Sequence, residues 1–272
     1  MSTFWKRLLS GTVYVGLVIA SILVSPIFFG VLFCLLTMLA VYEYHELLGT
    51  HLVCTVGAIL AGGYLFATTW CLFQVETLDI ADFATMQIVY AAFIALLLLL
   101  ELWVKSEDPI RNWGDLLISQ AMVALPFACM NIILDSSKYL LLALFITIWV
   151  NDTGAYCIGM LTAKRKNGNH KMFPRVSPKK SWEGLIGGFA FSLLAGYIYY
   201  VVGWMDSLPK ALAFALIIAV SGTFGDLMES LLKRALGVKD SGKFLPGHGG
   251  VLDRFDSLLL AAPVAAILAV LL

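Results

Sequence analysis

The chain has 272 residues, with 18 basic and 18 acidic side chains, and it is 60% hydrophobic but only 13% charged. Soluble domains usually contain about 25% charged residues. Ionised groups this scarce cannot cover the surface of a soluble protein. The composition therefore excludes an ordinary soluble enzyme and predicts an integral membrane protein.

Long apolar runs predict an all-α fold of about nine transmembrane helices, because crossing a bilayer takes about 20 apolar residues. The predicted spans are 11–25, 27–48, 52–73, 84–104, 115–133, 138–160, 183–203, 209–232 and 255–272. The first pair is the least defined, since only Ser25-Pro26 separates them. Residues 11–48 form either two spans or one span with a re-entrant or interfacial piece.

The loops predict the orientation. Lys6 and Arg7 precede the first predicted span, and the loop 164–180 holds seven of the 18 basic residues without an acid. Lys and Arg accumulate in cytoplasmic loops. An even number of spans separates these two segments, and two more lead to the polar stretch 233–254. We therefore expect the N-terminus and both polar loops on the cytoplasmic side of a bacterial inner membrane.

Residues after about 150 hold nearly all of the chemistry-bearing side chains. We therefore divide the chain into scaffold helices, 1–137, and a catalytic region, 138–272, within one continuous membrane domain. Net charge is zero, so bulk electrostatics says nothing about partners. We expect no nucleic-acid partner.

The span 209–232 and its end carry a polar face. Asp226, Glu229, Ser230 and Lys233 follow one another at spacings of three and four, which places them on one side of a helix. Carboxylates inside a bilayer are costly unless they pair with cations, lie near the interface or bind a metal. The alternative is a structural acid–lysine pair at a helix end.

The segment 239–256 combines glycines, basic residues and two aspartates. Glycines let the backbone approach a ligand closely, and lysines and a histidine suit a phosphate. Asp253 and Asp256 are three apart and would project from one side of a helix that begins there. Carboxylates are the ligands that Mg²⁺ prefers, so the segment predicts metal-dependent phosphate chemistry rather than a solvated connector.

Two shorter motifs can serve the same site. Asp152 and Tyr156 lie one helical turn apart in Asn-Asp-Thr-Gly-Ala-Tyr and are expected to face the same way. Lys179 and Lys180 follow Pro178, in a turn whose Ser181 can cap the next span. These lysines bind nucleotide phosphates, or they are positive-inside residues that meet anionic headgroups. His45, His51 and His170 are expected to be structural or solvated.

The stretch SLLKRALGVKDSGKFLPGHGGVLDRFD, from Ser230 to Asp256, resembles the signature of the phosphatidate cytidylyltransferases (CDP-diacylglycerol synthases). NDTGAY and SPKKSWEG also resemble family segments, so the motif resemblance covers residues 150–256. In one departure, Ala163-Lys164 stands where the family has Gly-Lys, and Lys164 is therefore left out of the site.

The resemblance implies that CTP and phosphatidic acid give CDP-diacylglycerol and pyrophosphate, with Mg²⁺ and a second cation, at a membrane-embedded homodimer. The catalytic residues it implies are Asp226, Lys233, Arg234, Lys239, Asp240, Lys243, His248 and Asp253. The substrate-binding residues are Asp152, Tyr156, Ser177, Lys179, Lys180, Ser230, Gly249, Gly250 and Arg254, and the metal ligands are Asp226, Asp253 and Asp256.

Two other functions remain open. A transporter or ion pathway would use Asp152, Asp226 and Glu229 for cation coupling, with helices broken near Gly222 and Gly225. Against it, the polar residues gather on one side of the membrane and no half of the chain is repeated. The nearer alternative is another CTP-using lipid enzyme, such as a polyprenol kinase or a cytidylyltransferase for a different lipid phosphate.

Overall fold

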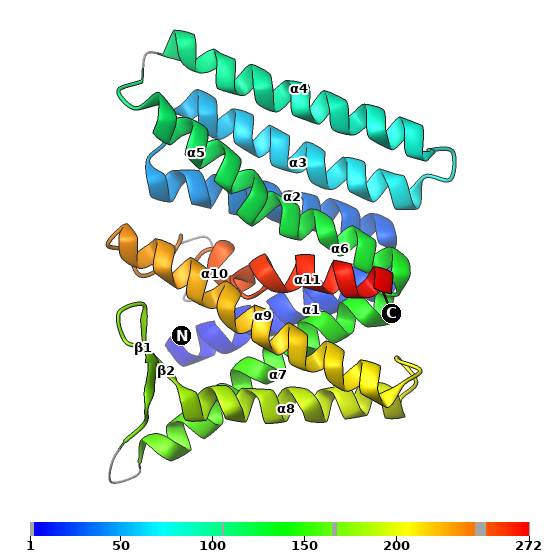
Figure 1. The fold of residues 1–272 in the computed structure, drawn as a ribbon, viewed down its shortest axis with the longest axis vertical. Helices are drawn as coiled ribbons and strands as arrows, with labels where there is room; N and C mark the ends of the chain where they lie inside the picture. The colour runs from blue at the N-terminus through cyan, green and yellow to red at the C-terminus, as the bar shows by residue number, and fades with distance from the viewer. Residues whose placement is uncertain (1–2, 105, 165–167, 243–248, 272) are drawn as a thin grey trace. The chain divides into compact units, whose positions relative to one another are not determined.

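A computed structural model describes residues 3–104, 106–164, 168–242 and 249–271 (Figure 1), and in the first helix it describes side chains from residue 11 onward. The chain forms two compact units, one of residues 1–135 and 240–255 and the other of residues 136–239 and 256–272. The chain thus passes from unit 2 into unit 1 between residues 239 and 240, and back into unit 2 between residues 255 and 256. The division into 1–137 and 138–272, drawn on chemistry, stays a prediction.

The regular elements described in unit 1 are all helices, joined by turns and loops. Its elements are α1 (Thr3–Val24), α2 (Pro26–Leu48), α3 (Leu52–Gln74), α4 (Ile80–Val104), α5 (Pro109–Ser119), the π-helical turn η1 (Gln120–Ala124), α6 (Leu125–Ser136) and the short α10 (Leu252–Phe255). In Figure 1, α2, α3 and α4 lie side by side, and α2 packs on α3 and α3 on α4.

Aromatic side chains hold the segment 240–255 in unit 1. The ring of Phe255 lies 6.0 Å from that of Phe33 and 5.1 Å from that of Phe127, centroid to centroid. Phe29 stacks on Phe33 at 4.5 Å, and all four rings are almost completely buried. Such aromatic clusters contribute packing energy beyond the area they bury, so the segment has a firm apolar anchor.

Unit 2 contains α7 (Lys138–Ala163), β1 (Lys171–Phe173), β2 (Ser177–Ser181), α8 (Trp182–Val201), α9 (Leu208–Ala235) and α11 (Leu258–Leu271). Helix α8 packs on both α7 and α9, α7 also contacts α9, and α11 packs on α9. The two strands form an antiparallel hairpin with Lys171 opposite Ser181. Ser181 caps α8, as predicted, by accepting a hydrogen bond from Gly184 N at 3.1 Å.

Among the described residues, seven helical stretches are long and apolar enough to cross a membrane, which supports a membrane protein but not the predicted nine spans. They are Pro26–Leu48, Leu52–Gln74, Ile80–Val104, Pro109–Ser136, Lys138–Ala163, Trp182–Val201 and Leu208–Ala235. Gly11–Val24 and Leu258–Leu271 are apolar but shorter. At 1.5 Å per residue, α11 reaches only about 21 Å of the roughly 30 Å hydrocarbon thickness.

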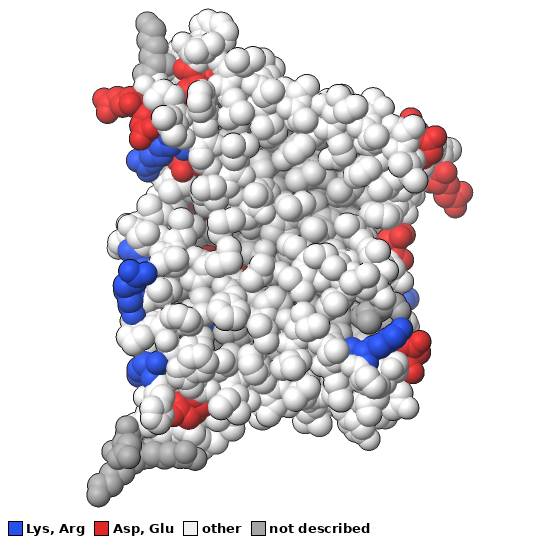
Figure 2. Space-filling model, viewed as in Figure 1, with Lys and Arg blue, Asp and Glu red and all other residues white. Residues whose placement is uncertain are grey.

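Charge is distributed as a membrane protein requires. On the face drawn in Figure 2, Lys, Arg, Asp and Glu gather towards the helix ends, and the helix sides between them are almost without charge. Large apolar side chains are exposed on several helices, for example 71% of Leu102 in α4 and 67% of Ile186 in α8. Lipid tails tolerate such surfaces, whereas water would not.

Candidate active site

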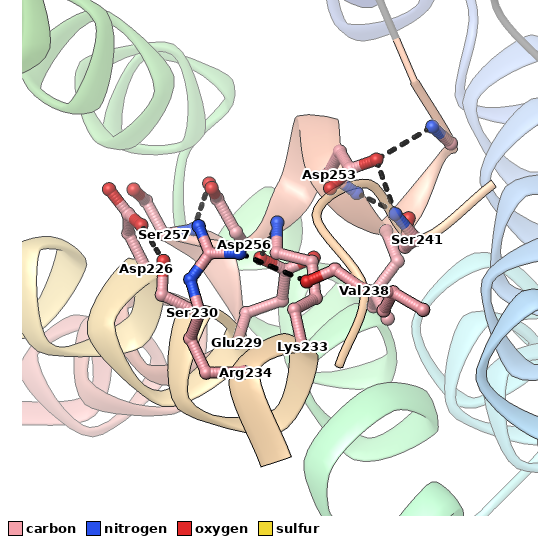
Figure 3. Close-up of polar contacts among 12 residues, drawn as sticks. Asp226, Glu229, Ser230, Lys233, Arg234, Val238, Ser241, Asp253, Asp256 and Ser257 are labelled. Carbon is pink, nitrogen blue, oxygen red and sulfur yellow. Dashed lines mark hydrogen bonds and ion pairs between the residues drawn. The ribbon is translucent and has the colours of Figure 1, made fainter. Parts of the chain in front are cut away.

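The polar residues of α9 share one face, which confirms the prediction from their spacing. Ser230 Oγ donates a hydrogen bond to Asp226 Oδ1 at 3.1 Å, and Lys233 forms an ion pair with Glu229. Both members of that pair are buried, Glu229 completely. Asp226 is only partly buried. The end of α9 therefore presents one accessible carboxylate, Asp226, beside an enclosed acid–lysine pair (Figure 3).

The hairpin contributes a lysine to this face. Lys180 Nζ lies 2.7 Å from Asp226 Oδ2 and donates a hydrogen bond to the backbone oxygen of Thr223 at 3.3 Å. About a quarter of each side chain is exposed, 25% for Lys180 and 26% for Asp226. A solute can therefore reach both charges, and an incoming phosphate or cation can compete for either one.

A cavity of about 460 Å³ in unit 2 contains this pair. Helices α7, α8 and α9 and the hairpin all contribute to its wall. Its charged and aromatic lining residues are Asp152, Tyr156, Lys171, Lys179, Lys180 and Asp226. Volumes of about 300–1,000 Å³ are usual for small-molecule sites. Three lysines and two carboxylates in one cavity suit a polyanion that arrives with a cation.

Asp256 belongs to the same acidic group. It lies in the turn between α10 and α11, outside the candidate spans. Burial raises the pKa of its carboxyl well above the usual range, and the nearby carboxylates of Asp226, Glu229 and Asp152 raise this pKa further. Carboxylates this close to one another are stabilised by a proton or by a bound cation.

The expectation that Asp253 and Asp256 project from one helix is wrong. Helix α10 ends at Phe255, and the turn that follows is stabilised by Ser257 N, which donates to Asp256 Oδ1 at 2.6 Å. Asp253 belongs to unit 1 and Asp256 to unit 2.

Asp253 organises the loop of unit 1. Its Oδ2 accepts hydrogen bonds from Ser241 N and Gly250 N, each at 2.8 Å, and Ser241 Oγ accepts one from Asp253 N at 3.2 Å. Gly249 has a φ of +81°, a conformation that favours glycine. Figure 3 shows the Asp253 carboxylate directed at these backbone groups. Its role as a metal ligand stays a prediction.

The other predicted site residues lie in several elements. Arg234 Nε donates to the backbone oxygen of Val176 at 3.3 Å, so it braces the hairpin against α9. Ser177 pairs with Phe173 in the hairpin. The backbone oxygen of Arg254 accepts a hydrogen bond from Tyr14 at 3.3 Å.

Four predicted site residues lie where the chain leaves unit 2 or beyond that point. Lys239 and Asp240 are exposed at the boundary between the two units in the chain, and Lys243 and His248 lie outside the described residues.

The three histidines make local contacts. His45 is buried, with Nε2 3.0 Å from Ser119 Oγ and Nδ1 2.8 Å from Thr50 Oγ1. His51 accepts a hydrogen bond from Val53 N at the start of α3, and His170 pairs with Glu183 at 2.6 Å. These contacts agree with the structural or solvated roles that were expected.

Sequence reasoning missed two residues with contacts to the predicted motifs. Lys171, interpreted only as part of the basic loop, lines the cavity because β1 pairs with β2. Glu43 of α2 contacts the backbone of the segment 240–255. A carboxylate within a predicted span was the available signal for Glu43, but Glu46, three residues later, carries the same signal.

The donor set fits Mg²⁺ held jointly by protein and substrate. Within the described part of the chain, no group of three or more His, Cys, Asp and Glu side chains is arranged as a metal site. Mg²⁺ usually takes one or two protein carboxylates and completes its shell with water and substrate phosphates. Asp226 and Asp256 suit that arrangement, because the carboxylate of Asp226 lies near enough to Asp256 to raise the pKa of Asp256.

Comparison with known proteins identifies the family. A model of the cytidylyltransferase family matches residues 5–272. The chain belongs to this family. The name of the family describes its members as cytidylyltransferases. The matched residues include the cavity, the polar face of α9 and the loop of unit 1.

Several bacterial proteins named phosphatidate cytidylyltransferase are similar to the chain over part of its length. The Staphylococcus saprophyticus protein is 40% identical over 153 residues, which cover 56% of this chain and 57% of that protein. The Staphylococcus haemolyticus protein is 44% identical over 135 residues, covering 49% and 50%. The matched region thus spans about half the length of these relatives.

Proposed function

We propose that this family member is a phosphatidate cytidylyltransferase, which transfers CMP from CTP to phosphatidic acid and forms CDP-diacylglycerol and pyrophosphate. The observation that carries the proposal is the cavity in which Lys180 and Asp226 meet. Family membership and the names of the staphylococcal relatives support the same reaction.

The reaction is a displacement at phosphorus. A phosphate oxygen of phosphatidic acid attacks the α-phosphorus of CTP and forms a new P–O bond. The bond from the α-phosphorus to the bridging oxygen of the β-phosphate breaks, and pyrophosphate leaves. Since a phosphate monoester is largely ionised near pH 7, the attack needs no general base from the protein.

The protein's part is to position the substrates and stabilise their charge. Lys171, Lys179 and Lys180 offset the negative charge of the triphosphate in the cavity. Lys180 leaves Asp226 for a phosphate oxygen when CTP binds, which frees the carboxylate.

Mg²⁺, when bound, neutralises the triphosphate and the pyrophosphate leaving group. Asp226 and Asp256 would hold it, while Asp253 and a second cation stay predictions from the resemblance.

The membrane setting follows from the same assignment. The loop charges favour a cytoplasmic N-terminus and a site that faces the cytoplasm of a bacterial cell, where CTP is available. Phosphatidic acid carries its phosphate at the membrane interface and its acyl chains in the bilayer, so neither substrate has to cross. The homodimer is proposed on the family resemblance alone.

Labelled CTP tests the reaction. The purified protein in detergent is incubated with Mg²⁺, phosphatidic acid and CTP labelled at either the α- or the γ-phosphate. Label from the α-phosphate should appear in lipid and γ-label in pyrophosphate. Transfer of γ-label to lipid would indicate a kinase instead, and no transfer to any lipid phosphate would refute the proposal.

The transporter alternative loses one of its supports. It required helices broken near Gly222 and Gly225, but α9 runs without interruption from Leu208 to Ala235. Gly225 instead allows the backbone oxygens of Asp256 and Ser257 to approach α9 closely.

A further inference from the structure

Glu43 is a buried carboxylate that bonds to the loop of unit 1. It lies in α2 with 3% of its surface exposed. Its Oε1 accepts a hydrogen bond from Val251 N and its Oε2 one from Leu252 N, both at 2.9 Å. Ser241 Oγ donates a third bond to Oε2 at 3.3 Å. Both carboxylate oxygens are therefore occupied by donors from a segment about 200 residues away in the chain.

Ser241 links Glu43 to Asp253. The Ser241 hydroxyl donates to Glu43 and accepts from Asp253 N, while Asp253 accepts from Ser241 N and Gly250 N. Asp253 thus accepts from the backbone N–H groups of Ser241 and Gly250, and Glu43 accepts from those of the two residues that follow Gly250. Loss of either would release donors that the other cannot satisfy, because unpaired buried polar groups are costly.

Two glycines of the segment are required by this contact. A Cβ added to Gly242 would lie 2.7 Å from Glu43 Oε1 and 3.2 Å from the Cα of Gly250. A Cβ added to Gly250 would collide with Glu43 Oε2 and with Ser241 Oγ. The backbone can approach the carboxylate only without side chains at these positions. Part of the glycine pattern that suggested a phosphate loop therefore serves to seat Glu43.

The chemistry of Glu43 is specific to a carboxylate. All three of its partners in this network donate a hydrogen, so both of its oxygens must accept. Glutamine has nearly the same shape, but its amide nitrogen cannot accept. In the variant Glu43→Gln, at least one donor, either a backbone N–H or the Ser241 hydroxyl, faces another donor.

We propose that Glu43 is a positioning residue for cytidylyl transfer, which holds the backbone of Ser241 and residues 250–252, and through it Asp253, in the arrangement that the reaction uses. The inference rests on the proposed function. It assigns a role in the reaction to a helix of the N-terminal scaffold, and Glu43 acts through the loop without touching the substrates.

Glu43→Gln tests the role, and Glu46→Gln is the matched control, since Glu46 is exposed one turn further along α2. Full-length proteins in detergent are compared for kcat and KM with CTP and phosphatidic acid, and for amide hydrogen exchange. We expect kcat/KM of Glu43→Gln to fall by about 10- to 100-fold, as for loss of a hydrogen bond to a charged group. Glu46→Gln should match the unmodified protein.

Amide hydrogen exchange distinguishes a positioning role of Glu43 from a general loss of folded structure. In Glu43→Gln, peptides covering residues 249–255 should exchange faster, whereas α3 and α4 should keep their protection. Ser241→Ala should cause a similar loss of kcat/KM, and the double variant should be little worse than either single one. Faster exchange across the whole of unit 1 would overturn the proposal in favour of a purely structural role.

Two further outcomes would also overturn it. One is unchanged kcat/KM in Glu43→Gln, even with faster exchange at 249–255. The other is additive losses in the double variant. If the unmodified protein transfers no CMP, the proposed function fails and the positioning role fails with it. Exchange would then still report whether Glu43 holds the loop, so the two failures are distinguishable.

Discussion

Replacing Gly225 with alanine tests how closely α9 must approach the turn that carries Asp256. A Cβ at this position would lie 2.8 Å from the backbone oxygens of both Asp256 and Ser257. Carbonyl oxygens of a turn cannot rotate away as a side chain could. The turn must therefore move by roughly half an ångström to regain ordinary contact.

Gly222 provides the control in the same helix, one turn earlier. A Cβ there would lie 3.5 Å from the Cβ of Ser257 and 3.7 Å from Ile148, both ordinary contacts. Gly222→Ala should gain up to about 1 kcal/mol from helix propensity. Gly225→Ala has the same gain but also an overpacking cost of about 1–3 kcal/mol. The two variants should therefore differ in stability by about 1–3 kcal/mol.

Thermal unfolding in detergent shows which of the two variants is less stable, and kcat/KM measures the effect of each substitution on the site. We expect Gly225→Ala to unfold at a lower temperature than Gly222→Ala. It should also lose about 10-fold or more in kcat/KM, because small displacements of a reacting group are costly. Equal stability and activity of the two variants would refute the reasoning that α9 and this turn are in tight contact.

Three other predictions concern the cavity. Asp226→Asn should lower kcat by about 10²-fold or more without unfolding the protein, whereas Asp206→Asn, at an exposed position before α9, should be fully active in the same assay. Lys180→Met should raise the KM for CTP and weaken its dependence on ionic strength, and an unchanged KM would remove Lys180 from the triphosphate site. Chelation with EDTA should abolish turnover and added Mg²⁺ should restore it, whereas Ca²⁺ should not, since it prefers a larger shell of six to eight oxygens.

The features that the sequence predicted correctly depend on neighbours in the chain. Spacing of four placed Asp226 and Ser230 on one face, and the hydrogen bond between them confirms it. The cap of α8 by Ser181 depends on Gly184, three residues on. Apolar runs located the long spans because each must bury or expose its own surface in lipid.

The features that the sequence did not predict, or predicted wrongly, depend on contacts between residues that are far apart in the chain or in elements too short to recognise. The hairpin strand Lys171–Phe173 is too short to show a periodicity. Helix α10 ends at Phe255, and the backbone oxygens of the turn that follows lie against Gly225 of α9. Glu43 has its partners 198 to 209 positions away. The sequence around Glu43 in α2 therefore gives no sign that hydrogen-bond donors elsewhere in the chain pair with its carboxylate.

The contact between Glu43 and Val251 also sets an order of events during synthesis. The two residues are 208 positions apart, and a ribosome that adds about 5–20 residues per second needs about 10–40 s to cover that distance. During this interval α2 enters the membrane with a carboxylate whose final donors have not yet been made. Unit 1 can complete its internal hydrogen bonding only after α9 of unit 2 has been synthesised. Helix α2 is therefore inserted well before the segment that completes the hydrogen bonding of Glu43.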